Sequence, residues 1–261
     1  MKIGFSSLAL FMKPLKEIFK IANEDEFEIV ELLCEGPYWS RYLLENQEEI
    51  NLDEIREMAI SYDIKIFLHA PTIDLNPASM NRGIREETQK QTIETLKVAD
   101  ILGAKAITIH PGIVHRKEKR IRDLAIGHAI ETLQPCQKYA EEIGIILSIE
   151  NMPKRFSYLA HCPKEHEKIV EAVGSSATID WGHANTYENP NEFLNIPNII
   201  YYHLNDNLAI KDQHLPLGEG NADFSNYFLK KVKYGIIELN SYENILKSKN
   251  FLIKQLKKNL N

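Results

Sequence analysis

Cysteine is scarce in this chain of 261 residues. Its three cysteines, Cys34, Cys136 and Cys162, lie far apart and form no CxxC pair. Disulfide-rich secreted domains and thiolate zinc sites both need several cysteines at short spacing. The sequence therefore argues against both classes. We expect a cytoplasmic protein, since a reducing compartment is the simplest setting for three isolated thiols.

Long apolar runs and an excess of basic residues are also lacking. The apolar stretch between Lys2 and Met12 is interrupted by Gly4 and Ser6, and no stretch approaches the roughly 20 apolar residues that cross a bilayer. Acidic residues outnumber basic ones, 37 against 31, which argues against a protein that coats nucleic acid through bulk charge. We expect no membrane segment, and no feature of the sequence predicts a protein partner.

Phosphate-binding turn signatures and linkers are absent as well. The first turns contain neither GxGxxG nor GxxxxGK, the signatures that open, doubly wound sheets often carry. No Pro/Ser-rich tract divides the chain. The length alone allows one large domain or two small ones. Without a linker, we predict a single domain over residues 1–261.

Short runs of β-branched and aromatic residues alternate eight times with longer amphipathic stretches. The predicted strands cover residues 2–7, 27–35, 64–71, 104–112, 145–152, 177–183, 199–206 and 234–240. The predicted helices cover residues 14–23, 52–62, 83–102, 119–143, 163–173, 191–194, 224–231 and 242–258. Several strands are nearly continuous apolar runs, as expected when both faces of a parallel sheet are covered. We therefore predict an α/β fold, a (β/α)8 TIM barrel, in preference to an open doubly wound sheet.

Chemically active side chains collect at the carboxyl ends of the predicted strands, where barrel enzymes build their active sites. The sequence there reads His-Ala-Pro, Ile-His-Pro-Gly, Ile-Glu-Asn, Asp-Trp-Gly-His, His-Leu-Asn-Asp, Asp-Gln-His-Leu-Pro-Leu-Gly-Glu-Gly and Ile-Ile-Glu. A single His, Asp or Glu at a strand end caps a helix or bonds a loop about as often as it belongs to an active site. Nine such residues at the same end of consecutive strands indicate an active site. Imidazoles and carboxylates without thiolates are the ligands of catalytic zinc, manganese and related divalent ions.

These motifs resemble those of the endonuclease IV family, the apurinic/apyrimidinic endonucleases of the xylose-isomerase-like barrel superfamily. The resemblance implies up to three divalent ions, zinc or alternatively manganese. It assigns His69, His110 and Glu150 to a first ion, Glu150, Asp180, His203 and Glu238 to a second, and His183, Asp212 and His214 to a third. The implied reaction is hydrolysis of a phosphodiester by metal-activated hydroxide, with Glu150 and Glu238 as catalytic residues. Damaged DNA or a small phosphorylated sugar is the implied partner.

A subset of these residues resembles the site of sugar isomerases in the same superfamily. The subset is Glu150, Asp180, His203 and Glu238. In such enzymes one metal holds vicinal sugar oxygens while two carboxylates move a proton. The alternative function is therefore a sugar or sugar-phosphate isomerase or epimerase. A third reading, a noncatalytic metal- or ligand-binding barrel, is disfavoured because structural zinc sites are generally closed and rich in cysteine.

Loop residues near the expected active-site rim are candidate substrate contacts. They are Trp39, Arg41, Arg82, Lys154 and Arg155, because aromatic rings stack on bases or sugars and cations bind phosphate. Packing and solvation are competing roles for each. Compared with DNA-binding members of the family, the loop after the second strand has a single cation, and Thr72 and Ile73 replace a Tyr-Leu wedge. We expect weak binding of duplex DNA.

Overall fold

Eight parallel strands close into one barrel in sequence order, with β1 paired to β8. The computed structural model describes residues 1–258, so the last three residues of the predicted domain lie outside the described residues. The strands are β1 (Lys2–Ser6), β2 (Ile29–Leu33), β3 (Lys65–His69), β4 (Ala106–Ile109), β5 (Ile146–Glu150), β6 (Ser176–Asp180), β7 (Ile199–Leu204) and β8 (Tyr234–Ile237). The predicted single (β/α)8 barrel is confirmed.

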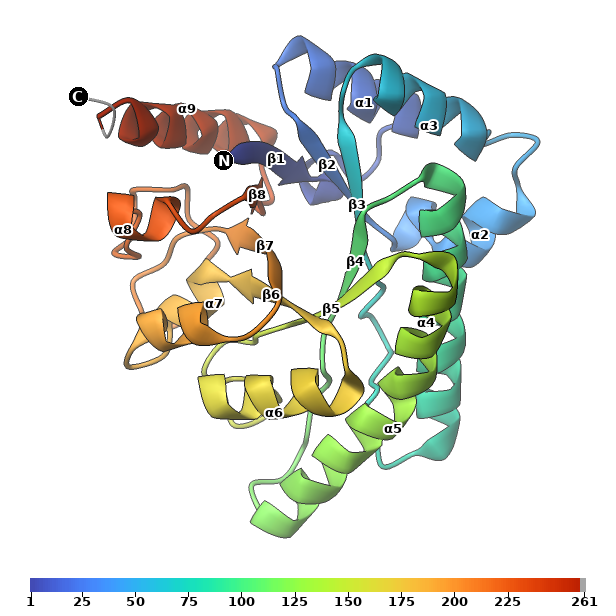
Figure 1. Ribbon diagram of the computed structural model, residues 1–261, viewed down its shortest axis with the longest axis vertical. Helices are drawn as coiled ribbons and strands as arrows, with labels where there is room; N and C mark the ends of the chain where they lie inside the picture. Colours follow the sequence, from blue (N-terminus) through green and yellow to red (C-terminus); the bar gives the residue numbers. More distant parts are fainter. Residues whose placement is uncertain (259–261) are drawn as a thin grey trace.

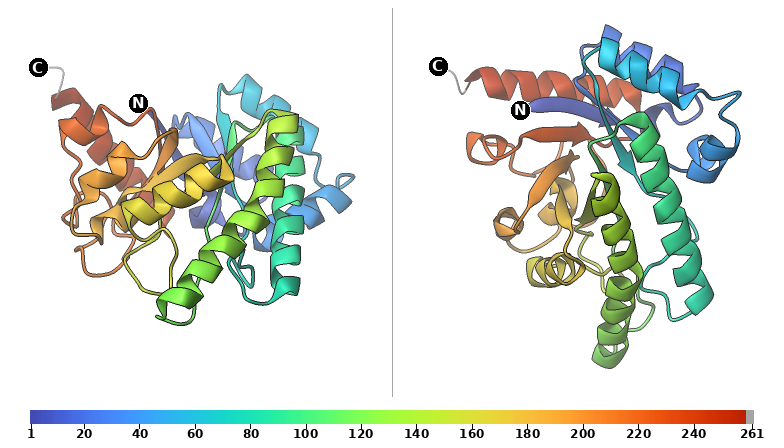
Figure 2. Two further views of the ribbon diagram at one scale, coloured as in Figure 1. Left: turned by 60° about the horizontal axis from the view of Figure 1, so that its bottom comes forward. Right: turned by 45° about the vertical axis from the view of Figure 1, so that its right-hand side comes forward.

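Helices surround the barrel on its outside (Figure 1). They include α1 (Leu15–Glu24), α3 (Leu52–Ser61), α4 (Arg82–Leu102), α5 (Lys119–Ile143), α6 (Pro163–Val173), α8 (Asn226–Leu229) and α9 (Tyr242–Lys258). The segment predicted as a helix at 191–194 is the 3-10 helix η3 (Pro190–Asn195). The long helices α4 and α5 pack side by side (Figure 2). Within residues 1–258 no helix combines the length and apolar character needed to cross a bilayer.

Four short elements in the βα loops were not expected from the sequence. They are η1 (Ser7–Leu10), η2 (Gly36–Tyr38), α2 (Ser40–Glu45) and α7 (Trp181–Asn185). The prediction that the sixth strand extends to His183 is wrong: the strand ends at Asp180, whose side chain accepts a hydrogen bond from the His183 backbone N–H at 2.6 Å and caps α7. Such short helices contain too few periodic positions to be recognised from an apolar pattern.

A layer of buried side chains lies beneath the candidate ligands and forms the floor of the site. Side chains two residues apart face the same side of a strand, so the residue two places before each of the six candidate ligands at the strand ends faces the barrel interior. These residues are Phe67, Thr108, Ser148, Thr178, Tyr201 and Ile236, all fully buried. The hydroxyls of Thr108, Ser148 and Thr178 form mutual hydrogen bonds of 2.6–3.1 Å. A packed, hydrogen-bonded layer therefore supports the side chains at the rim.

Candidate metal centre

The strand ends direct the candidate ligands toward the barrel axis. His69, Glu150 and Asp180 are the last residues of β3, β5 and β6. His203 precedes the last residue of β7, and Glu238 follows β8 directly. The nine predicted ligands form three groups, in each of which the ligand atoms lie within 4.8 Å of one another.

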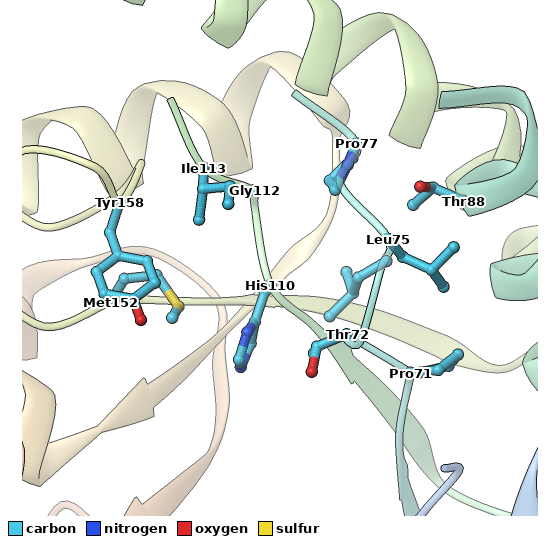
Figure 3. A pocket seen from close by; sticks show the side chains of 11 residues that line it. Pro71, Thr72, Leu75, Pro77, Thr88, His110, Gly112, Ile113, Met152 and Tyr158 are labelled. Atoms are coloured by element: carbon cyan, nitrogen blue, oxygen red, sulfur yellow. The ribbon is translucent and has the colours of Figure 1, made fainter. Parts of the chain in front are cut away.

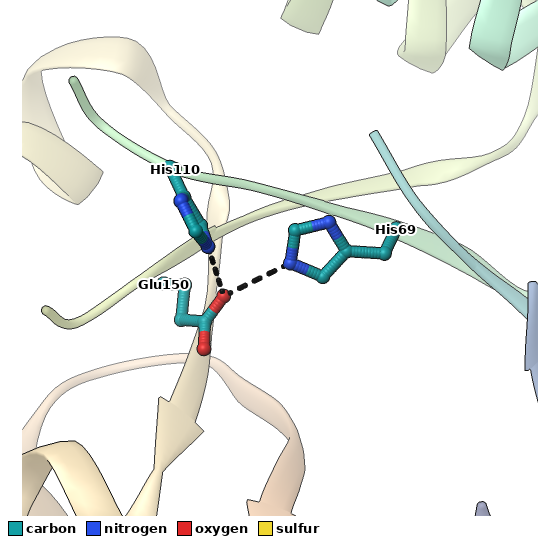
Figure 4. Close-up of side chains that lie close together, drawn as sticks. All are labelled: His69, His110 and Glu150. Carbon is teal, nitrogen blue, oxygen red and sulfur yellow. Dashed lines mark hydrogen bonds and ion pairs between the residues drawn. The ribbon is translucent and has the colours of Figure 1, made fainter. Parts of the chain in front are cut away.

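The first group contains His69, His110 and Glu150 (Figure 4). The Nε2 atoms of His69 and His110 lie 3.3 and 3.2 Å from Oε2 of Glu150. His69 donates its Nδ1–H to the Ala70 carbonyl at 2.8 Å, so Nε2 is the nitrogen directed at the group. The His110 side chain is 30% exposed whereas that of Glu150 is 1% exposed, so solvent reaches this group from the His110 side.

The second group contains Glu150, Asp180, His203 and Glu238. His203 Nδ1 lies 3.0 Å from Oε1 of Glu150 and 3.4 Å from Oε2 of Glu238. Glu150 therefore directs one carboxylate oxygen at the first group and the other at the second. Three carboxylates gathered in a buried site need compensating positive charge, which a divalent cation supplies.

The third group contains His183, Asp212 and His214. The Nε2 atoms of the two histidines lie 3.3 and 3.1 Å from Oδ2 of Asp212. Backbone carbonyls of Asn151 and Glu238 accept the Nδ1–H of His183 and His214 at 2.8 and 2.9 Å. Oδ1 of Asp212 is buried without a hydrogen-bond partner among the described residues. The donors and the unpartnered oxygen fit a divalent cation bound by nitrogen and oxygen.

Mutual ion pairing dominates the protonation of these groups. Burial opposes the charge on Glu150, yet His203, His110 and His69 hold the pKa of Glu150 well below its usual range. Burial likewise opposes the charge on His203, but Glu31 and Glu150 raise the pKa of His203 well above its usual value. Protonated histidines here compensate the same carboxylates that bound cations would compensate.

Asp180 is the exception among the carboxylates. Burial, together with Glu150 and Glu238, raises the pKa of Asp180 to about 7 although His183 opposes the shift. Asn205 donates to its Oδ2 at 2.8 Å. A carboxyl group that holds its proton near neutrality in this setting is one that a bound cation would ionise.

The five candidate substrate contacts have other partners or face solvent. Trp39 donates its Nε1–H to Gln91 at 2.8 Å, and Arg41 pairs with Glu87 and Glu94, so both side chains are tied to α4. Arg41 also lies in helix α2, although the sequence indicated a loop. Arg82 pairs with Glu86 and Lys154 with Glu188, while Arg155 is exposed. Substrate contact by these residues stays a prediction.

A small cavity of about 270 Å³ lies beside the first group (Figure 3). His110 lines it together with side chains from the loops that follow β3, β4 and β5. The lining residues are Pro71, Thr72, Leu75, Pro77, Thr88, Ile109, His110, Gly112, Ile113, Met152 and Tyr158. This volume is at the small end for ligand pockets and suits a single sugar ring or a comparable group.

Sequence reasoning missed a buried carboxylate that contacts one of the ligands. Glu31 in β2 is 0% exposed and lies 2.9 Å from His203 Nε2. The available signal was a single acidic residue inside the apolar run Ile-Val-Glu-Leu-Leu, since Glu is almost never fully buried without a partner.

Comparisons with known proteins agree with this fold. The chain matches the family described as xylose isomerase-like TIM barrel over residues 19–250. It is similar to an uncharacterized protein of Methanocaldococcus jannaschii, MJ1311, with 33% identity over 265 residues that cover 97% of this chain and 88% of that protein.

Two solved structures that are similar to this chain carry the names of different reactions. A D-tagatose 3-epimerase-like protein has 32% identity and a TM-score of 0.85, with coverage of 98% of this chain and 97% of the other. Endonuclease IV from Thermus thermophilus has 18% identity and a TM-score of 0.75, with coverage of 99% and 100%. The second likeness is one of fold alone. Proteins named for two different reactions thus share this barrel.

Proposed function

Since the chain belongs to the xylose isomerase-like TIM barrel family, we propose that it is a metal-dependent hydrolase of phosphodiesters that works at the three ligand groups. The observation that supports this most is the third group, His183, Asp212 and His214. An isomerase that uses one metal needs only the four ligands of the second group. Five additional ligands at the same rim favour a multinuclear site.

The proposed ligands are the nine residues of the three groups, and the proposed ions are zinc, with manganese as the alternative. Zinc accepts imidazole and carboxylate ligands and leaves positions open in catalytic sites. When bound, several divalent ions neutralise phosphate charge, lower the pKa of water and stabilise the leaving oxygen. The charge balance of the described site supports this proposal, because its buried carboxylates are otherwise compensated only by histidinium protons.

Glu150 and Glu238 are the proposed catalytic residues. Glu150 holds the first and second groups at a fixed spacing, because its two oxygens face different groups. Glu238 is 14% exposed at the edge of the second group. Burial opposes its charge, but His203 and His214 lower its pKa, so Glu238 remains ionised and is able to accept a proton from the reacting group.

The proposed substrate is a small phosphorylated sugar or a damaged end or abasic site in DNA. The cavity beside His110 has room for one sugar-sized group. Of the candidate contacts, Trp39 and Arg41 are tied to α4 in partly buried contacts. Arg82 and Lys154 pair only with exposed carboxylates and Arg155 is exposed, so these three are the proposed phosphate contacts. Weak binding of intact duplex follows from this shortage of cations and wedge residues.

A second candidate function is a sugar or sugar-phosphate epimerase or isomerase. The 32% identity to a D-tagatose 3-epimerase-like protein favours it. In this reaction Glu150 and Glu238, which both lie near His203 Nδ1 in the second group, would remove and return a proton at a sugar carbon. The third group would then have no part in the chemistry.

One experiment separates the two candidates. Metal-loaded protein is incubated with a synthetic abasic-site oligonucleotide and with a panel of ketoses, aldoses and their phosphates. We expect cleavage 5′ to the lesion that leaves a 3′ hydroxyl, abolished in Glu238→Gln and in His183→Ala. His128→Ala, which changes a histidine on α5 outside the three groups, is the matched control.

The opposite outcome is equally specific. Interconversion of a sugar without strand cleavage, lost in Glu238→Gln but retained in His183→Ala, would reject the hydrolase and establish the epimerase. His183 distinguishes the reactions because it contributes to the third group and not to the second.

A further inference from the structure

Glu31 is a buried carboxylate that the three ligand groups do not include. It lies in β2 two residues after Ile29, which packs in the interior cluster of the barrel. By strand alternation both side chains face the interior. Glu31 pairs in register with Phe67 of β3, so it lies at the level of the layer beneath the ligands and outside their groups.

Its two carboxylate oxygens have different surroundings. Oε2 accepts hydrogen bonds from the Tyr201 hydroxyl and from His203 Nε2, both at 2.9 Å. Oε1 is buried without a hydrogen-bond partner among the described residues. Both donors come from β7, which is not a neighbour of β2 in the barrel. The contact thus crosses the barrel interior and orients one oxygen toward His203.

This contact determines which nitrogen of His203 is free. A neutral imidazole carries a proton on one nitrogen and a lone pair on the other. Oε2 of Glu31 lies 2.9 Å from Nε2 as a hydrogen-bond acceptor, so the contact favours the form with the proton on Nε2. Nδ1 is then the nitrogen directed at the second group, where it lies 3.0 Å from Glu150 and 3.4 Å from Glu238, and it would offer its lone pair to a bound cation.

His203 differs in this respect from three other ligands. His69, His183 and His214 each donate Nδ1–H to a backbone carbonyl and present Nε2 to their groups. His203 presents the opposite nitrogen, and a side chain takes the place of the carbonyl. Its orientation therefore depends on a residue that can be exchanged without changing the backbone.

We propose that Glu31 is a positioning residue that holds His203 with Nδ1 directed into the second ligand group, ready to bind a cation there. The proposal rests on the metal-binding part of the proposed function. Tyr201 supports Glu31 in this role, since its hydroxyl is also hydrogen-bonded to Thr108, which in turn bonds Thr178 at 2.6 Å. The hydrogen-bonded layer beneath the site thereby holds the Glu31 carboxylate in place, and Glu31 in turn orients His203.

The test is a zinc titration of Glu31→Gln against the wild type and a control. Exchange of a partner that orients a metal ligand typically weakens metal binding 10–100-fold, and we expect a loss of that size for one ion. Glu35→Gln is the matched control, because Glu35 is also a buried carboxylate but bonds the backbone of Thr72 and Ile73. It should bind zinc as the wild type does.

A second readout reports the tautomer directly. Nitrogen NMR of zinc-loaded protein with labelled histidine, with the His203 signals identified by their loss in His203→Asn, should show Nε2 protonated and Nδ1 metal-bound. Glu31→Leu, which offers no acceptor, should lose this single form. If Glu31→Gln fails to fold, Tyr201→Phe removes one of the two donors to Glu31 and should weaken zinc binding by a smaller factor.

The outcomes separate this proposal from the proposed function. A wild type that binds zinc, with equal affinity and the same His203 signals in Glu31→Gln and Glu31→Leu, would overturn the role of Glu31 and leave the metal site standing. A wild type that binds no zinc would overturn both. For Tyr201→Phe, zinc affinity equal to the wild type would count against the proposal.

Discussion

Replacement of Glu150 by glutamine should damage the protein in two separable ways. The carboxylate is buried and faces His69, His110, His203 and His183 at 3.0–3.6 Å. Removal of one partner from a buried ion pair costs about 3–5 kcal/mol, because the other charge stays buried and uncompensated. For a chain of this size, 1 kcal/mol shifts Tm by about 2–4 °C, so metal-free Glu150→Gln should melt roughly 6–20 °C lower.

Metal content gives the second effect. Glu150 belongs to two ligand groups and His214 to one, so Glu150→Gln should lose two ions and His214→Ala only one. The assay is elemental analysis of zinc-loaded protein after gel filtration, together with thermal unfolding of the metal-free forms. Equal loss of ions in the two variants would refute the bridging role, and an unchanged Tm in Glu150→Gln would refute the electrostatic reasoning.

Changes in pH and at one glycine and one tryptophan position test other parts of the structure. Despite the opposing effect of burial, Glu150 and Asp212 raise the pKa values of His69 and His214 to about 9. The folded metal-free protein therefore binds more protons than the unfolded chain above pH 6.5. Its free energy of unfolding should fall as pH rises from about 6.5 to 9. A Tm in EDTA that rises over this range would contradict it. Gly182→Ala should weaken zinc binding, because the new Cβ would lie 1.8 Å from Asn205, which bonds Asp180; Gly127→Ala, with no atom within 4 Å of its Cβ, is the control, and equal affinities would refute the argument. Trp181→Ala should cost about 3–5 kcal/mol in urea unfolding, since the ring is buried and stacks on Phe228 at 4.1 Å; a cost below about 1 kcal/mol would show that the stack contributes little.

The barrel and the ligand positions could be predicted because both depend on local patterns. Apolar runs of strand length recur eight times, and His69, Glu150 and Asp180 stand where those runs end. Period-two alternation then directs these side chains inward. The grouping into three sets came from the family resemblance, and the structure places the same residues together.

Other features depend on contacts between distant segments and could not be predicted. Helix α2 places Arg41 against Glu87 and Glu94 of α4, a pairing across 46 and 53 residues. Glu31 and His203 are 172 residues apart. The cavity beside His110 is formed by loop side chains such as Leu75 and Tyr158, whose apolar character alone gives no sign of a pocket.

Three ligand groups on one rim are proposed to bind three ions in one chain. Anomalous diffraction at the zinc edge, from crystals of the zinc-loaded protein, locates each ion. We expect three peaks per chain: one among His69, His110 and Glu150, one in the second group, and one among His183, Asp212 and His214. A single peak in the second group, with His183, Asp212 and His214 free of metal, would rule out the three-ion site.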